Sequence, residues 1–164
     1  MSYHIYTTRG IVLSEYPRKE ADRIYSVLTR DLGLVKAFAI GVRKEASKLR
    51  GSLEPYTLSS ISLVRGKEYW RATSAESIRN IPAKPTIARP LALLEKLVQG
   101  EASNPDLFDA VEESIVSHEF DEESEIKFVS KILYHLGYLK ESDLVLDKKS
   151  LVRAINDGIQ ASHL

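Results

Sequence analysis

Residues 5–40, IYTTRGIVLSEYPRKEADRIYSVLTRDLGLVKAFAI, decide the fold. Their runs of Ile, Val, Tyr and Thr predict strands at residues 5–14, 23–29 and 34–40, because such side chains favour a pleated surface. Asp31-Leu32-Gly33 predicts a tight turn, which makes the last two strands an antiparallel hairpin. Gly10, inside the first run, predicts a bulge or a sharp bend of the kind that barrel strands need.

Two further strands follow. Residues 58–64 and 68–73 are expected to form a second hairpin around Arg65-Gly66-Lys67. Five short strands with no long helix between them predict a closed or partly open β-barrel.

The second half of the chain has a helical pattern. Pro82, Pro85 and Pro90 indicate a linker at about residues 80–86. Helices are expected at residues 87–98, from Pro105 onward after an N-cap at Ser103-Asn104, at 122–136 and at 148–160. The acidic run at residues 119–123 is interpreted as a solvated helix start and not as a metal site. The fold class is therefore α+β, with a β domain at 1–80 and an α-helical domain at 81–164.

Composition narrows the possible functions. The chain has 164 residues, 43% of them hydrophobic, and no cysteine, which removes disulfides, thiolate zinc sites and cysteine nucleophiles. Its apolar runs are short and its N-terminus has no apolar signal region, so we expect a cytoplasmic protein without a membrane segment.

The net charge of the whole chain is zero, but the charged residues are distributed unequally between its two halves. Residues 1–80 hold 14 Lys+Arg and 8 Asp+Glu, a net of +6, whereas residues 81–164 hold 9 and 15, a net of −6. A basic half attracts phosphates.

The loop at residues 41–56, GVRKEASKLRGSLEPY, is the first candidate site. Its cations can reach phosphates from beside the barrel; they are Arg43, Lys44, Lys48 and Arg50. The alternative is a solvated loop with Leu49 and Leu53 tucked into the barrel. A second basic set flanks Tyr69 and Trp70, where strand alternation places Tyr69 with Arg71 and turns Trp70 to the other face, as a core residue.

Signatures of enzymes are missing from the sequence. It has no phosphate-binding GxxxxGK[ST] motif, no GxGxxG and no nucleophile elbow, and its four histidines are scattered. We therefore expect a protein that is not an enzyme and needs no cofactor or metal.

The order of several short motifs resembles the N-terminal domain of the RecO family of bacterial recombination mediators. The matching segments are Thr8-Arg9-Gly10-Ile11-Val12-Leu13, Glu20-Ala21-Asp22, Leu28-Thr29, Gly33-Leu34, Gly41-Val42-Arg43-Lys44, Ser47, Leu53 and Pro55-Tyr56. The resemblance covers residues 5–80, and a weaker one extends to residues 128–138. The helical half departs from the family, because it is short and lacks the four-cysteine zinc site that many members carry.

The resemblance implies an OB-fold barrel followed by an α-helical domain. It also implies binding of single- and double-stranded DNA, strand annealing, and action with RecR and with the acidic tail of single-strand-binding protein. The DNA-backbone contacts would come from Arg43, Lys44, Lys48 and Arg50, with Arg9, Lys36 and Arg71 as additional contacts on the strands. Two alternatives remain open: a protein-interaction adaptor whose helical half docks a partner, and an RNA-binding OB module.

Overall fold

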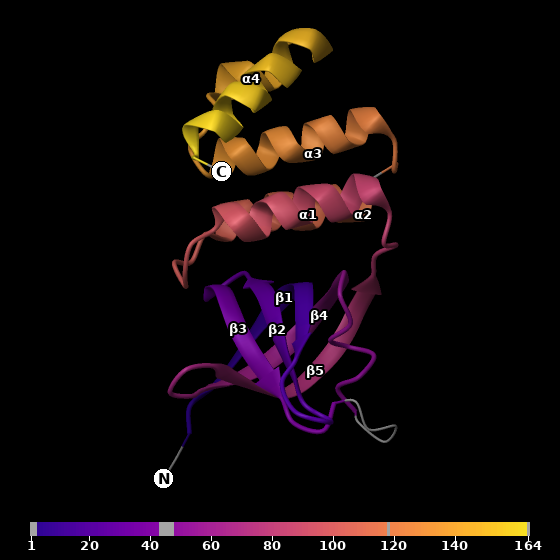
Figure 1. Ribbon diagram of the computed structural model, residues 1–164, viewed down its shortest axis with the longest axis vertical. Coiled ribbons are helices and arrows are strands. Elements are labelled where there is room, and N and C mark those ends of the chain that lie inside the picture. Colours follow the sequence, from indigo (N-terminus) through magenta and orange to yellow (C-terminus); the bar gives the residue numbers. More distant parts are fainter. Residues whose placement is uncertain (1–2, 43–47, 118, 164) are drawn as a thin grey trace. The chain divides into compact units, whose positions relative to one another are not determined.

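The computed structural model describes residues 3–42, 48–117 and 119–163 (Figure 1). The chain forms two compact units, Met1–Pro82 with Gly100–Pro105, and Ala83–Gln99 with Asp106–Leu164. The segment 100–105 was expected in the helical half, but it packs with the barrel. None of the described helices is both long and apolar enough to span a lipid bilayer.

The first unit is a closed five-stranded barrel with the strand order β1-β2-β3-β5-β4. The strands are β1 (Ile5–Pro17), β2 (Arg23–Thr29), β3 (Gly33–Ala39), β4 (Thr57–Arg65) and β5 (Trp70–Asn80). All neighbours are antiparallel except β3 and β5, which pair in parallel at Ala37–Trp70 and Phe38–Arg71. This is the expected OB-fold, a five-stranded Greek-key barrel.

Strand β1 closes the barrel because it pairs with two partners in succession. Its residues 5–11 pair with β4 and its residues 10–17 pair with β2. Gly10 lies at the changeover, where a Cβ atom would come within 2.7 Å of Val27 Cγ1. The irregularity in pairing falls between Val12 and Ser14, three residues beyond the expected position. Gly10 is thus required by close packing inside the barrel rather than by a bulge of its own.

The barrel interior is filled mostly by small and branched side chains, with two aromatic ones, from all five strands and from the β3–β4 loop. Every one of the following is at most 6% exposed: Val12, Tyr25, Val27, Val35, Ala37, Ala39, Val42, Leu53, Ile61, Leu63, Trp70 and Ala72. Alternation along the strands sends the intervening side chains outward.

The second unit contains the helices α1 (Pro85–Leu97), α2 (Pro105–Ser117), α3 (Glu122–His135) and α4 (Lys148–Ala161), with the 3₁₀ helix η1 (Glu141–Val145) before α4. Asp121 caps α3 by accepting a hydrogen bond from the Ser124 backbone, which confirms the acidic run as a helix start. A core cluster of this unit gathers around Leu97, Leu133, Leu139, Leu151 and Ile155.

Strand β1 runs three residues beyond its expected end at Ser14, and two further elements differ from expectation. Strand β5 runs seven residues beyond the expected end at Thr73. The sequence did not predict this extension, because residues 73–80 are mostly exposed and carry no alternating apolar pattern. The short helix η1 was not expected, since no residue of it is buried.

Candidate nucleic-acid interface

One outward-facing row of side chains crosses four strands of the barrel. In order of pairing the row consists of Tyr16, Ile24, Phe38 and Arg71. Directly paired residues point to the same side of a sheet. Their neighbours along the strands point into the core; these are Tyr25, Ala37 and Trp70. The row is therefore on the outer surface of the barrel.

The turn between β1 and β2 adds a cation to this row. The Arg18 guanidinium lies 4.6 Å from the ring centroid of Phe38 and 5.8 Å from that of Tyr69, in the β4–β5 turn. The β1–β2 turn is held by Arg18 N donating to Asp22 O at 3.0 Å, and Asp22 Oδ1 accepts from Gly41 N at 2.7 Å. In the described part of the chain no carboxylate pairs with Arg18, so its five N–H donors face no protein anion there.

Lys36 makes a similar contact one row away. Its Nζ lies 5.3 Å from the ring centroid of Tyr16, two strands distant. Lys36 is paired with Ser26, and Ser26 with Ser14, so the lysine stem crosses β2 over the buried Ser26. An aliphatic stem that packs on the surface while its charge stays in water is the usual arrangement for lysine.

We call this surface the ring-lined face and define it by six residues: Tyr16, Arg18, Lys36, Phe38, Tyr69 and Arg71. These residues lie on β1, β3 and β5 and in the β1–β2 and β4–β5 turns, around the outer side of β2. In an OB-fold, the face of strands 2 and 3 and these two turns bind oligonucleotides. The cations of the ring-lined face can neutralise phosphates, and its rings offer π-faces on which bases can stack.

Some cations of the barrel lie against carboxylates, and Arg65 is one of them. Arg65 Nη1 lies 2.8 and 2.7 Å from the two carboxylate oxygens of Glu101, which also accepts from Trp70 Nε1 at 3.0 Å. The same guanidinium lies 4.9 Å from the centroid of Trp70. Glu101 belongs to the segment 100–105, which we call the docked segment. Arg65 therefore has a protein anion where Arg18 has none among the described residues.

Glu15 and Arg23 form a second such pair at the rim of the barrel. The hydrogen bond that Arg23 donates to Glu15 raises the pKa of Arg23 above its usual value. Behind the pair, burial raises the pKa of Tyr25 to about 12, and the Glu15 charge adds to the rise. Arg23 therefore stays charged and Tyr25 stays protonated across the neutral range.

The loop between β3 and β4 is anchored through its leucines. Leu53 is 1% exposed within the barrel core and Leu49 packs against it, while Ser59 Oγ donates to Ser52 O at 2.6 Å. Lys48 and Arg50 are exposed. The other two loop candidates, Arg43 and Lys44, lie outside the described residues.

The strand candidates divide into two places. Lys36 and Arg71 are on the ring-lined face. Arg9, although exposed, is paired with Ser60 in the row that contains Glu76, away from that face. Trp70 is buried, at 6% exposure, as the alternation argument indicated.

Sequence reasoning did not single out Tyr16, Arg18 and Phe38. Tyr16 and Phe38 are far apart in the chain and meet only through the register of β1, β2 and β3. Alternation was the available signal, because Lys36 and Phe38 are two residues apart on one strand and so share its outer side.

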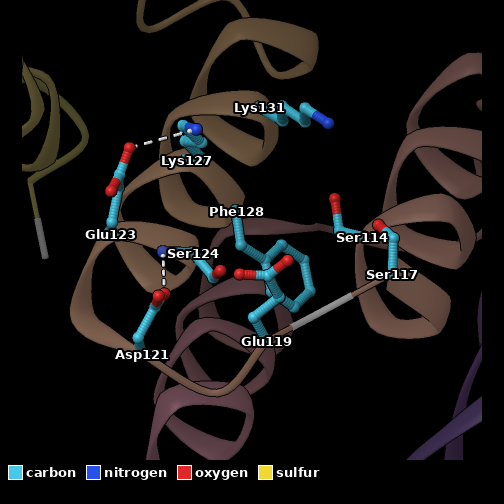
Figure 2. Close-up of a pocket in the computed structure, with 9 residues that line it drawn as sticks. All are labelled: Ser114, Ser117, Glu119, Asp121, Glu123, Ser124, Lys127, Phe128 and Lys131. Atoms are coloured by element: carbon cyan, nitrogen blue, oxygen red, sulfur yellow. Dashed lines mark hydrogen bonds and ion pairs between the residues drawn. The ribbon is translucent and has the colours of Figure 1, made fainter.

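The helical unit has a polar pocket of about 310 Å³ between α2 and α3, shown in Figure 2. Its lining residues are Ser114, Ser117, Glu119, Asp121, Glu123, Ser124, Lys127, Phe128 and Lys131. Lys127 is paired with Glu123 at 3.2 Å. Three carboxylates against two lysines give this pocket a net negative lining, which does not suit an anionic ligand. Over the described residues, no group of three or more His, Asp or Glu side chains is placed to hold a metal ion.

An OB-fold whose outer face combines cations with aromatic rings fits the class of oligonucleotide-binding barrel modules. Comparison with known proteins gives a narrower result. Residues 1–81 match the family described as "Recombination protein O N terminal". The chain belongs to the RecO family.

Individual relatives agree with this assignment. A "DNA repair protein RecO" from Dehalococcoides mccartyi is 46% identical over 77 residues, which are 47% of this chain and 30% of that protein. One from Synechococcus is 44% identical over 79 residues, 48% of this chain and 27% of that protein. One from Heliobacterium modesticaldum is 30% identical over 162 residues, 94% of this chain and 59% of that protein. The chain thus spans less than two thirds of the length of these relatives.

Proposed function

We propose that this chain is a DNA-binding recombination mediator that anneals strands during DNA repair in the cytoplasm, and that it is not an enzyme. The observation that carries the proposal is the ring-lined face, which gathers Arg18, Lys36 and Arg71 around three aromatic rings. The name "DNA repair protein RecO" of its relatives supports the same role.

The mechanism is electrostatic. Each phosphate that a cation neutralises releases a condensed counterion, which favours binding at low salt. Contacts to the backbone leave the edges of the bases exposed, so a bound strand can pair with a second one. The exposed Lys48 and Arg50 in the β3–β4 loop are further cations that a second strand can contact.

The partners are part of the proposal. RecR and single-strand-binding protein are the ones that membership of the RecO family suggests. The pocket between α2 and α3 is a poor site for an acidic tail, because Glu119, Asp121 and Glu123 line it. We therefore assign contact with that tail to cations of the basic barrel.

A titration of the full chain with a fluorescein-labelled oligo(dT) tests the proposal. The double variant Lys36→Ala/Arg71→Ala is expected to bind about tenfold more weakly, with a slope of log K against log salt that is about 1.4 shallower, because two phosphate contacts are lost. Lys149→Ala/Arg153→Ala on α4 removes the same charge from the helical unit and serves as control. Equal affinities for the two variants would contradict the proposal.

The same titration addresses the two alternatives. Wild-type chain that binds no oligonucleotide would favour an adaptor whose helical half docks a protein. Preference for oligo(U) over oligo(dT) would favour an RNA-binding module. Annealing of strands coated with single-strand-binding protein, with and without RecR, then tests the mediator step itself.

A further inference from the structure

The arginine on the ring-lined face occupies the place where a base would stack. Arg18 presents a planar cation to the ring of Phe38, with centroid and guanidinium carbon 4.6 Å apart, and Tyr69 is the next ring at 5.8 Å. A nucleobase is also planar and stacks on aromatic rings at a similar separation. The guanidinium and a base therefore compete for one face of Phe38.

The competition favours the base. A guanidinium over a ring at an exposed site is a weaker contact than a base stacked on a ring. Arg18 also has no carboxylate partner among the described residues, so leaving the ring breaks no ion pair there. Once displaced, it can hold a phosphate of the same strand through its paired N–H donors.

From this geometry we propose that Phe38 is the base-stacking position of the site and that Arg18 is its displaceable cover, so that the face selects unpaired bases. This inference rests on the proposed function. A duplex keeps its bases stacked inside and must extrude one to reach Phe38, at an unfavourable free energy. A single strand offers its base faces directly. Arg18 then changes its contact from ring to phosphate when the strand binds.

Two substitutions separate the two roles. Phe38→Leu removes the ring and keeps an apolar side chain. It is expected to weaken binding of a single-stranded oligonucleotide about tenfold, as for the loss of one base–aromatic stack, and to change duplex affinity less than about twofold. A 2-aminopurine base in the oligonucleotide, quenched on stacking with wild-type protein, is expected to stay bright with this variant.

Arg18→Ala gives the opposite pattern. The slope of log K against log salt is expected to become shallower by about 0.7, the value for one single-strand phosphate, while the quenching of 2-aminopurine is kept. Arg18→Lys, which keeps a point charge, is expected to restore the slope.

Controls keep the outcome decisive. Tyr3→Leu removes an exposed ring outside the ring-lined face and is expected to change neither readout. Phe38→Tyr retains a ring and is expected to quench 2-aminopurine as the wild type does. The duplex affinity that Phe38→Leu is expected to keep shows that this variant is folded. If Phe38→Leu weakens single strand and duplex equally, or keeps the quenching, the stacking role is wrong although DNA binding stands. If the wild type binds neither DNA, both the inference and the proposed function fail.

Discussion

Two regions of the barrel differ in whether a carboxylate binds the arginine that lies over an aromatic ring. On the ring-lined face Arg18 lies over aromatic rings and, within the described chain, pairs with no acid. At the docked segment Arg65 also lies over an aromatic ring, but Glu101 binds it through both carboxylate oxygens. The ring contact is common to both, and the carboxylate is the difference.

The comparison shows what makes a cation available to a phosphate. A guanidinium that already has a carboxylate partner must give up that ion pair before it can bind DNA. One that lies on a ring exchanges a weaker contact. Counting basic residues, which gives +6 for residues 1–80, therefore overstates the binding surface. Under the proposed function, the contacts of each cation decide whether it can bind a phosphate.

The largest effect is expected from a substitution that displaces the docked segment from the barrel. Gly33 has a φ of +74°, and a Cβ there would lie 2.6 Å from the Ala102 carbonyl oxygen. Gly33→Ala is expected to lower the free energy of unfolding by about 3 kcal/mol, because a positive φ and a clash with backbone act together. Urea unfolding measures the change.

Gly51→Ala is the matched control. Gly51 has nothing within 4 Å of its would-be Cβ, and no positive φ is recorded for it. Its substitution is expected to change stability by less than about 0.5 kcal/mol. Equal losses at the two glycines would show that the docked segment is not seated on Gly33.

The next effect concerns Tyr25, behind the Glu15–Arg23 pair. Its pKa is about 12 in the folded chain, against 10.0 for the side chain unperturbed, chiefly because of burial. Below pH 10 both states keep the proton. Between pH 10 and 12 only the unfolded chain loses it, so stability falls as pH rises through that window. At pH 11 the loss amounts to about 1.4 kcal/mol.

Urea unfolding at pH 9 and pH 11 isolates this contribution. Tyr25→Phe has no proton to lose, so its stability is expected to fall less between the two pH values by about 1.4 kcal/mol. A fall as large as that of the wild type would mean that the Tyr25 hydroxyl is not buried as described.

The smallest effect is expected from removing the carboxylate partner of Arg65, which makes the surroundings of Arg65 resemble those of Arg18. Glu101→Gln keeps an acceptor for Trp70 Nε1 but removes the carboxylate charge. Because both side chains are about half exposed, at 57% and 41%, we expect a loss of only about 0.5 kcal/mol in stability. Arg65 becomes free to bind phosphate, and single-strand affinity is expected to rise about twofold to threefold. Anisotropy titration measures it; unchanged affinity would mean that Arg65 lies beyond the path of the strand.

Much of the fold could be predicted from local pattern. Five elements begin within one residue of the expected position: the strands β2 and β3 and the helices α2, α3 and α4. Their first residues are marked by local signals, namely alternation, an N-cap and Pro105. The end of β5 could not be predicted, since Ser74 to Asn80 is largely exposed and has no buried side to set a period of two. Docking of residues 100–105 on Gly33 also escaped prediction, because nothing local marks a contact about 70 residues away in the chain.

The candidate site was predictable only in part. Charge predicts Lys36 and Arg71 as contacts, and both lie on the ring-lined face. Charge also predicts Arg9, which lies elsewhere. Phe38 has no charge, and its role depends on the pairing of β3 with β5 and on the turn that carries Arg18. Such a site is a product of register, which residue type alone does not specify.

The salt dependence of single-strand binding by the triple variant Arg18→Ala/Lys36→Ala/Arg71→Ala tests the ring-lined face most directly. Three lost phosphate contacts are expected to make the slope of log K against log salt shallower by about 2 relative to the wild type. A slope identical to that of the wild type, with the variant folded, would contradict the assignment of this face to nucleic acid.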